Sequence, residues 1–215
     1  MTPALSIIMP CWLRPQRTER AIRSVLEQTR CNWELLCVGD ACPVLPEAWE
    51  RVTGAKRSDY VHHFRNGGCG CMKNMLMHEG AYGTQCLNAG LDMARAPFVC
   101  FLGNDDFFLP DHVATRLDSI EGKDLDAVYH DALIRFPGGD RIRGGGELRE
   151  GIVGGSEFIL RTELAKQVRF QSGAYGHDWT FIKSLHATGA KIGYFRSATY
   201  VVTHLPGQLI EQGID

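Results

Sequence analysis

Strand-like apolar segments alternate with helix-like segments in the first half of the chain, and this alternation limits the possible folds more than any other feature. The apolar runs are short and end at glycine, proline or polar residues, whereas the segments between them place apolar residues on one helical face. Strands are expected over 4–10, 33–40, 60–64 and 98–103, and helices over 16–29, around 46–52 and over 83–95. Thr18 is the expected N-cap of the first helix. Because strands that alternate with helices pair in parallel, the sequence predicts an α/β fold with a mostly parallel central sheet flanked by helices.

Polar residues follow three of the expected strands. They are Pro10-Cys11-Trp12, Gly39-Asp40 and Asn104-Asp105-Asp106. Ligands of open α/β sheets bind beyond the carboxyl ends of the strands, so these residues are expected to line one crevice. The pair Asp105 and Asp106 lies between two apolar segments, where two carboxylates can hold a hard divalent cation that bridges phosphate oxygens. The alternative is that the pair only forms the turn before the next helix.

Composition and charge narrow the class of protein. A chain of 215 residues, of which 44% are hydrophobic and 22% charged, is expected to form one globular domain. The formal net charge of −2 gives no basic footprint for nucleic acid, and no apolar run approaches the length of a membrane span. The N-terminus shows neither a basic leader nor a cleavage site, so a secretory signal is not expected.

The eight cysteines all lie in the first half of the chain, at spacings that do not resemble a disulfide framework. Without a secretion signal, reduced thiols and a cytoplasmic location are the simpler interpretation. Cys69 and Cys71, with His62, His63 and His78 nearby, could hold zinc. Paired zinc ligands usually stand further apart in sequence and no second pair follows, so zinc is the weaker interpretation.

A glycine-rich segment over 137–155 is expected to form a hairpin and a mobile loop between the two halves of the chain. Its arginines Arg141, Arg143 and Arg149 could attract phosphate, although a solvated hairpin face is the favoured interpretation.

Several blocks of the sequence resemble, in order and spacing, the family 2 glycosyltransferases of the GT-A fold. The opening "LSIIMPCWLRPQRTERAIRSVLEQTRCNWELLCVGDA" is similar to the first strand–helix–strand unit, and "LNAGLDMARAPFVCFLGNDDFFLPDHV" to the block that carries the DxD-type metal motif. The segments "GGSEFILRTELAKQV" and "GAYGHDWTFIKSLHATGAKIGYF" resemble the acceptor half. Three positions depart from the pattern: Asn104 replaces the first carboxylate of the motif, His177 replaces a glutamate, and Leu87 stands where an arginine is frequent.

The resemblance implies a single GT-A domain over 1–215, with a nucleotide-sugar-binding half over 1–106 and an acceptor-binding half over 107–215. It implies transfer of a sugar from a nucleotide-diphosphate donor, expected to be a UDP-sugar, to a hydroxyl of a glycan or other glycoconjugate. Mn²⁺ or Mg²⁺ is the implied cofactor, with Asp106 and His204 as its ligands. Asp105 would lie near the ribose or a metal-bound water. His204 could equally be an ordinary surface histidine.

Other residues take implied roles in donor and acceptor binding. Asp40 would accept a hydrogen bond from the nucleobase and Trp12 would stack on it, although Trp12 could also be a partly buried core residue. Asp178 would be the general base of an inverting reaction, unless it only caps the following helix. The remaining implied site residues are Pro10, Cys11, Asn88 and Asn104 for the donor, and Gly155, Ser156, His177 and Trp179 for the acceptor.

Rival classes leave different signatures. A sugar-phosphate nucleotidyltransferase shares the sheet, carboxylates and metal but usually begins with a glycine-rich phosphate loop, which "PCWLRPQRTERA" lacks. A retaining glycosyltransferase stays open, because the stereochemistry depends on site geometry. A non-catalytic carbohydrate-binding module would not need Asp40, the Asp105–Asp106 pair and Asp178 together. A dinucleotide-dependent dehydrogenase is disfavoured because no G-x-G-x-x-G follows the first strand.

Overall fold

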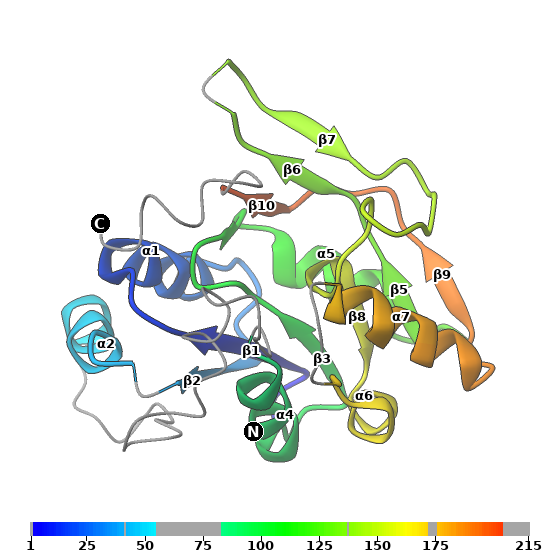
Figure 1. Cartoon of the computed structure of the whole chain (residues 1–215), viewed down its shortest axis with the longest axis horizontal. Helices are drawn as coiled ribbons and strands as arrows, with labels where there is room; N and C mark the ends of the chain where they lie inside the picture. The colour runs from blue at the N-terminus through cyan, green and yellow to red at the C-terminus, as the bar shows by residue number, and fades with distance from the viewer. Residues whose placement is uncertain (1, 41, 55–82, 137, 172–175, 204–215) are drawn as a thin grey trace.

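The computed structural model describes residues 2–40, 42–54, 83–136, 138–171 and 176–203 (Figure 1). Its helices are α1 (Pro15–Leu26), α2 (Leu45–Thr53), α4 (Thr84–Met93), α5 (His112–Ile120), α6 (Thr162–Val168) and α7 (His177–Ala187), with a short 3₁₀ helix η2 (Gly155–Glu157). Its strands are β1 (Leu5–Cys11), β2 (Trp33–Gly39), β3 (Phe98–Phe101), β4 (Phe107–Phe108), β5 (Ala127–Tyr129), β6 (Ala132–Ile134), β7 (Arg141–Arg143), β8 (Phe158–Arg161), β9 (Ile192–Tyr194) and β10 (Tyr200–Val202). The strand expected over 60–64 and the zinc candidates lie outside the described residues.

The central sheet has six strands in the order β2-β1-β3-β8-β5-β9. Strand β1 pairs in parallel with β2 and β3, and β5 pairs in parallel with β9. Strand β8 runs antiparallel to both of its neighbours, β3 and β5. The expected mostly parallel sheet flanked by helices is therefore confirmed, with one reversed strand in its middle.

Alternating side chains of the sheet strands bury two separate layers, as the two-residue period of a strand requires. Ile7 and Met9 of β1 pack with Ile22 and Val25 of α1, in a cluster that also includes residues of α2 and α5. Ile8 points to the other face, into a cluster formed with residues of α4, α6 and α7. Among the described helices, α1, α2 and α5 thus cover one face of the sheet, and α4, α6 and α7 cover the other (Figure 1).

A second sheet of four short strands, in the order β4-β10-β6-β7, extends from the central sheet. Strand β10 pairs with β4 immediately after the aspartate pair and with β6 on its other side. Strands β6 and β7 form the hairpin at the top of Figure 1. A hairpin was expected within 137–155, but only its second strand lies there, because β6 precedes the segment. Among the described helices, none is both long and apolar enough to cross a membrane.

The start of α1 differs from the expectation that Thr18 caps it. The helix begins at Pro15, whose fixed φ suits the first turn, and Arg14 occupies the cap position in the left-handed conformation. Thr18 lies one turn inside the helix and is buried, where its hydroxyl accepts a hydrogen bond from Asn104. The sequence suggested the right helix but the wrong cap, because Thr18 is used for a contact with the loop after β3.

Candidate active site

The polar strand ends lie along one edge of the central sheet. Since β1, β2, β3, β5 and β9 all run in the same direction, their carboxyl ends share that edge, and the reversed strand β8 begins there. In the order of the sheet, the edge therefore carries Asp40, then the segment after Cys11, then Asn104–Asp106, and then Gly155–Glu157 before β8. Segments far apart in the sequence thus meet at one side of the sheet, as expected from the strand ends.

The loop after β1 holds two consecutive residues in an unfavourable backbone conformation. Leu13 and Arg14 have φ of 51° and 58°, in the left-handed region that non-glycine residues rarely adopt. The Asn104 amide stabilises this turn by donating to the carbonyl oxygens of Trp12 and Leu13, at 3.4 and 3.3 Å, and to the Thr18 hydroxyl at 2.9 Å. Asn104 is therefore a positioning residue that connects the loop after β3 to the loop after β1, and its predicted donor contact stays a prediction.

Asp105 is buried and forms an ion pair with Arg14. Arg14 Nη1 lies 2.5 Å from Asp105 Oδ2, and both side chains are almost fully covered. Arg20, two turns into α1, donates to the backbone carbonyl of Asp105. Two guanidinium groups thus lie at the aspartate pair, where a buried carboxylate needs a compensating charge.

Asp106 is held by residues near the end of the described chain. The Tyr200 hydroxyl donates to Asp106 Oδ2 at 2.7 Å, and the Thr203 N–H donates to Oδ1 at 2.9 Å. Burial, together with the Asp106 carboxylate, raises the pKa of Tyr200 well above its usual value, so the phenol stays protonated and donates. At Gly103 a Cβ would lie 2.9 Å from Asp105 Oδ1, which explains why a glycine precedes the motif.

The two carboxylates fit a divalent cation in part. Each carboxylate oxygen can accept about two interactions, and Tyr200 and Thr203 bond to different oxygens of Asp106. Within the part of the chain that the structure describes, no group of three or more His, Cys, Asp or Glu side chains is arranged to hold a metal. Mg²⁺-type sites are commonly completed by substrate phosphates and water around one or two carboxylates. The hard oxygen donors here suit that arrangement, and His204 lies outside the described residues.

The predicted nucleobase residues lie at the ends of β1 and β2. Asp40 is buried, and its N–H donates to the Cys11 carbonyl at 3.0 Å, which brings the two strand ends together. Trp12 is half-buried and belongs to neither of the two hydrophobic clusters of the described residues. This argues against the alternative that Trp12 is a core residue. Cys11 is buried and its thiol donates to the Met9 carbonyl, so it faces the interior, while Pro10 is partly exposed.

Asn88 makes contacts that differ from the donor role implied for it. Its Nδ2 donates to the Phe170 carbonyl at 2.8 Å, and its Oδ1 accepts from the Phe170 N–H at 2.9 Å. This reciprocal pair attaches the segment after α6 to α4. The ring of Phe170 in turn stacks on Phe181 of α7, with ring centroids 4.1 Å apart. Asn88 therefore positions the helix that carries Asp178.

Replacement of Asn88 by alanine is expected to lower the free energy of unfolding by about 1–3 kcal/mol, because two backbone groups of Phe170 lose their partners. Thermal or urea unfolding measures this effect. Gln85→Ala, at an exposed position of the same helix, is the control and should be close to neutral. A variant of normal stability with weakened nucleotide binding would instead support the donor contact.

Asp178 is not the N-cap of α7, so the capping alternative is wrong. The cap is Gly176 in the left-handed conformation, and Asp178 is the second residue of the helix. Its carboxylate lies against the backbone of Gly154 and Gly155. A Cβ added at Gly154 would lie 3.1 Å from Asp178 Oδ2, and one added at Gly155 would lie 3.1 Å from Oδ1. Its side chain keeps 41% of its surface exposed. The glycines thus allow close approach of a carboxylate that still reaches solvent.

The environment of Asp178 favours its ionised form. Burial acts to raise the pKa, but hydrogen bonding and charge from His177 and the Gly155 N–H outweigh it, and the pKa lies below its usual value. His177 Nε2 is 3.1 Å from Asp178 Oδ1. Trp179 is partly buried against the cluster that contains Phe181, so it helps to pack the helix, and its predicted acceptor contact stays a prediction.

The buried Glu157 pairs with the partly exposed Arg143 near Asp178. The Arg143 guanidinium pairs with the Glu157 carboxylate, whose other oxygen accepts from the Gly154 N–H at 2.8 Å. Arg116, fully buried, donates to the Glu157 carbonyl. Burial lowers the pKa of Arg116 to about 10. Arg143 is thus not part of a simple solvated hairpin face, in contrast to the interpretation favoured from sequence.

A chain of contacts connects the aspartate pair to Asp178. Tyr200 bonds to Asp106 and also interacts with the Ser156 hydroxyl, while Gly155 bonds to Asp178. The predicted acceptor residues Gly155 and Ser156 therefore lie between the two predicted reaction centres. Sequence reasoning missed Arg14, Arg20, Tyr200, Thr203 and Glu157. Of these, only Arg14 and Arg20 left a signal, in the spacing of "RPQRTER".

Comparisons with known proteins bear on the fold and on the class of protein. No family model matches the chain. Over 84 residues it is 36% identical to the putative colanic acid biosynthesis glycosyl transferase WcaA of Escherichia coli, covering 37% of this chain and 30% of that protein. Over 140 residues it is 27% identical to the putative glycosyltransferase EpsH of Bacillus subtilis, covering 63% of this chain and 35% of that protein. The chain thus spans about a third of the length of these curated relatives.

Solved structures resemble the whole described fold at low sequence identity. TarS of S. aureus in complex with UDP matches with a TM-score of 0.69 at 17% identity, covering 96% of this chain and 62% of that one. A mannosyltransferase of Pyrobaculum calidifontis in complex with GDP-Man and Mn²⁺ matches with a TM-score of 0.67 at 15% identity, covering 94% and 57%. The chain therefore has a fold of the GT-A type, and over part of its length its sequence is similar to proteins named as glycosyltransferases.

Proposed function

We propose that the chain is a glycosyltransferase that moves a sugar from a nucleotide-diphosphate donor to a hydroxyl group of a glycan or glycoconjugate. The observation that carries the proposal is the contact chain from Asp106 through Tyr200 and Ser156 to Asp178. This contact chain joins two kinds of carboxylate. Asp105 and Asp106 form a pair that would suit a metal-bound diphosphate, whereas Asp178 is a separate carboxylate that is ionised and partly exposed. The names of the relatives and of the similar structures support the same reaction class.

The donor would lie beyond β1, β2 and β3. Asp40 and Trp12 would bind the base, and uridine is the proposed base because a similar structure, that of TarS, is of a complex with UDP. Asp106 would hold Mn²⁺ or Mg²⁺, which when bound neutralises charge on the leaving diphosphate. Asp105, fixed by Arg14, would face the ribose or a metal-bound water.

Asp178 would accept the proton of the attacking hydroxyl in an inverting displacement. Its lowered pKa keeps it ionised at neutral pH, which is the state a base requires, but also makes it a weak base. The proton is therefore transferred as the new O–C bond forms, when the hydroxyl becomes strongly acidic. Gly155 and His177, which touch the carboxylate, would hold it in one orientation.

A screen of nucleotide release tests the proposal. Wild-type protein, mixed with UDP-, GDP- and dTDP-sugars with and without Mn²⁺, is expected to release the nucleoside diphosphate from at least one UDP-sugar. Release of pyrophosphate from a nucleoside triphosphate and a sugar phosphate would instead identify a nucleotidyltransferase. Mass spectrometry of the products separates the two reactions, and the anomeric configuration of the product distinguishes inversion from retention.

A further inference from the structure

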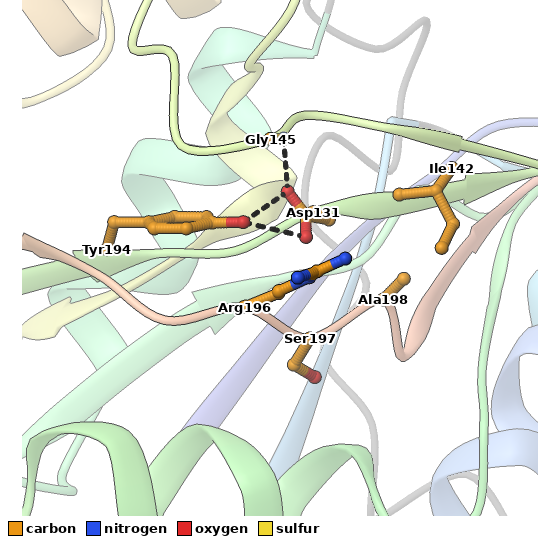
Figure 2. Close-up of a pocket in the computed structure, with 7 residues that line it drawn as sticks. All are labelled: Asp131, Ile142, Gly145, Tyr194, Arg196, Ser197 and Ala198. Atoms are coloured by element: carbon orange, nitrogen blue, oxygen red, sulfur yellow. Dashed lines mark hydrogen bonds between the residues drawn. The ribbon is translucent and has the colours of Figure 1, made fainter.

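A second concave region lies on the same edge of the sheet, beyond Asp178. It is a pocket of about 600 Å³, within the range of small-molecule sites. Its lining residues are Asp131, Ile142, Gly145, Tyr194, Arg196, Ser197 and Ala198 (Figure 2). None of them was singled out from the sequence, and none takes part in the donor site described above.

The pocket is built around the buried carboxylate of Asp131. The Tyr194 hydroxyl donates to both carboxylate oxygens, at 3.0 and 2.9 Å, and the Gly145 N–H donates to Oδ1 at 2.7 Å. At Gly144 a Cβ would lie 2.0 Å from Oδ1, so the chain after β7 can approach the carboxylate only because glycine stands there. A carboxylate has about four acceptor positions, so Oδ2 keeps the capacity to accept from a ligand.

The walls of the pocket combine a cation with exposed aromatic and aliphatic surface. Arg196 is exposed, and among the described residues no hydrogen bond or ion pair engages its guanidinium. In Figure 2 its side chain extends beneath Asp131 toward Ile142. Ile142 is 67% exposed and Tyr194 is 38% exposed, values that are high for large hydrophobic side chains. These apolar surfaces lie next to a negative and a positive group.

The position of the pocket relates it to the proposed acceptor path. Asp131 follows β5 and Tyr194 ends β9, and β5 is the neighbour of β8, which begins directly after Gly155–Glu157. Neighbouring strands are about 4.8 Å apart, so the pocket lies one to two strand spacings beyond the residues that contact Asp178. A chain of sugar rings that enters the active site from this side would pass over it.

We propose that this pocket is an acceptor subsite that binds a neutral sugar ring of a glycan, at a distance from the hydroxyl that receives the transferred sugar. Asp131 would accept from one hydroxyl and Arg196 would donate to its neighbour, while Tyr194 and Ile142 would contact the apolar C–H surface of the ring. This inference rests on the proposed function. An anionic group is disfavoured because it would lie against the Asp131 carboxylate as well as Arg196.

Binding of simple glycosides tests the pocket independently of catalysis. The probes are methyl glycosides of glucose, galactose, mannose and N-acetylglucosamine, with glucuronic acid and inorganic phosphate as anionic counterparts, measured by NMR titration. At least one neutral glycoside is expected to bind, and Arg196→Ala is expected to weaken it roughly tenfold or more, as for a hydrogen bond to a charged group. Arg141→Ala, on the exposed part of the same hairpin, is the matched control and should bind like wild type.

Kinetics then separate the subsite from the proposed function. With the donor found in the nucleotide-release screen and an oligosaccharide ending in the bound sugar, Arg196→Ala should raise the acceptor KM by a similar factor, and Arg141→Ala should not. If donor turnover occurs but Arg196→Ala leaves the acceptor KM unchanged, the subsite is wrong and the function stands. If glycosides bind but no donor is turned over, the acceptor role fails. Binding of the anionic probes alone, or of no probe, would also overturn the subsite.

Discussion

Asp178→Asn is expected to lower the rate of sugar transfer by a factor of about 10² to 10⁴, the usual contribution of a general base. Asparagine keeps an oxygen that can accept from the Gly155 N–H, but it cannot take a proton. The helix should form normally, because its cap is Gly176 and not the carboxylate. Steady-state kinetics should therefore show a large fall in kcat with little change in the donor KM.

The controls for this variant test its folding, its nucleotide binding and whether the effect is specific to the position of Asp178. The melting temperature and the calorimetric affinity for UDP should match those of wild type. Asp124→Asn removes a carboxylate that is 90% exposed, away from the site, and should leave kcat unchanged.

The pH dependence of kcat/KM gives a second test of Asp178. Because its pKa lies below the usual value of an aspartate, the carboxylate stays ionised as the pH falls to about 4. A loss of kcat/KM that begins above pH 5 would therefore come from the protonation of another group. Near wild-type transfer by Asp178→Asn would assign the base to a different residue.

Removal of divalent metal by EDTA is expected to abolish nucleotide release, and Mn²⁺ or Mg²⁺ to restore it. Asp106→Ala should lower turnover by about 10²- to 10⁴-fold, since a metal contributes several kcal/mol of charge stabilisation. The structure adds a second effect: the Tyr200 O–H and the Thr203 N–H both lose their acceptor, so this variant should also melt at a lower temperature.

Tyr200→Phe is the matched variant that separates these two effects. It removes the hydrogen bond of the Tyr200 hydroxyl to Asp106, together with those to the Gly103 N–H and Ser156, but keeps the Asp106 carboxylate. We expect it to lose stability to a similar degree while losing much less activity than Asp106→Ala. Equal losses of activity in both variants would show that the carboxylate acts through packing alone. Full turnover of wild type in chelator would remove the metal from the mechanism.

The sequence predicted those parts of the fold that local pattern controls. β1, β2 and β3 and helices α1, α2 and α4 lie close to their expected positions, because each has a long apolar run or a clear helical face. Strands β5, β6, β7, β9 and β10 have three residues each, too few for a two-residue period to be visible. The antiparallel direction of β8 depends on pairing with β3 and β5, which local sequence does not encode.

The sequence predicted the carboxylates of the candidate site, but not the residues that contact them. Asp40, Asp105 and Asp106 were indicated by their positions after strands, and the position of Asp178 by family resemblance. Arg14 could not be expected to adopt a left-handed conformation, because Asn104 and Asp105, which contact Leu13 and Arg14, lie about 90 residues away in the sequence. The pocket around Asp131 depends on glycines and a tyrosine that come together only in the folded sheet.

The attachment of Asp106 to Tyr200 and Thr203 has a consequence for the order in which the protein can fold during synthesis. The two hydrogen bonds span 94 and 97 residues of sequence, and β4 pairs with β10 across a similar separation. Contacts of such long range form slowly because the intervening loop must close first. A ribosome that has completed the first 106 residues has made the aspartate pair and Arg14, but not Tyr200 and Thr203, which orient Asp106. The geometry of the Asp106 carboxylate can therefore mature only after residue 203 has left the exit tunnel. Until then the edge of β4 is unpaired and can bind wrong partners.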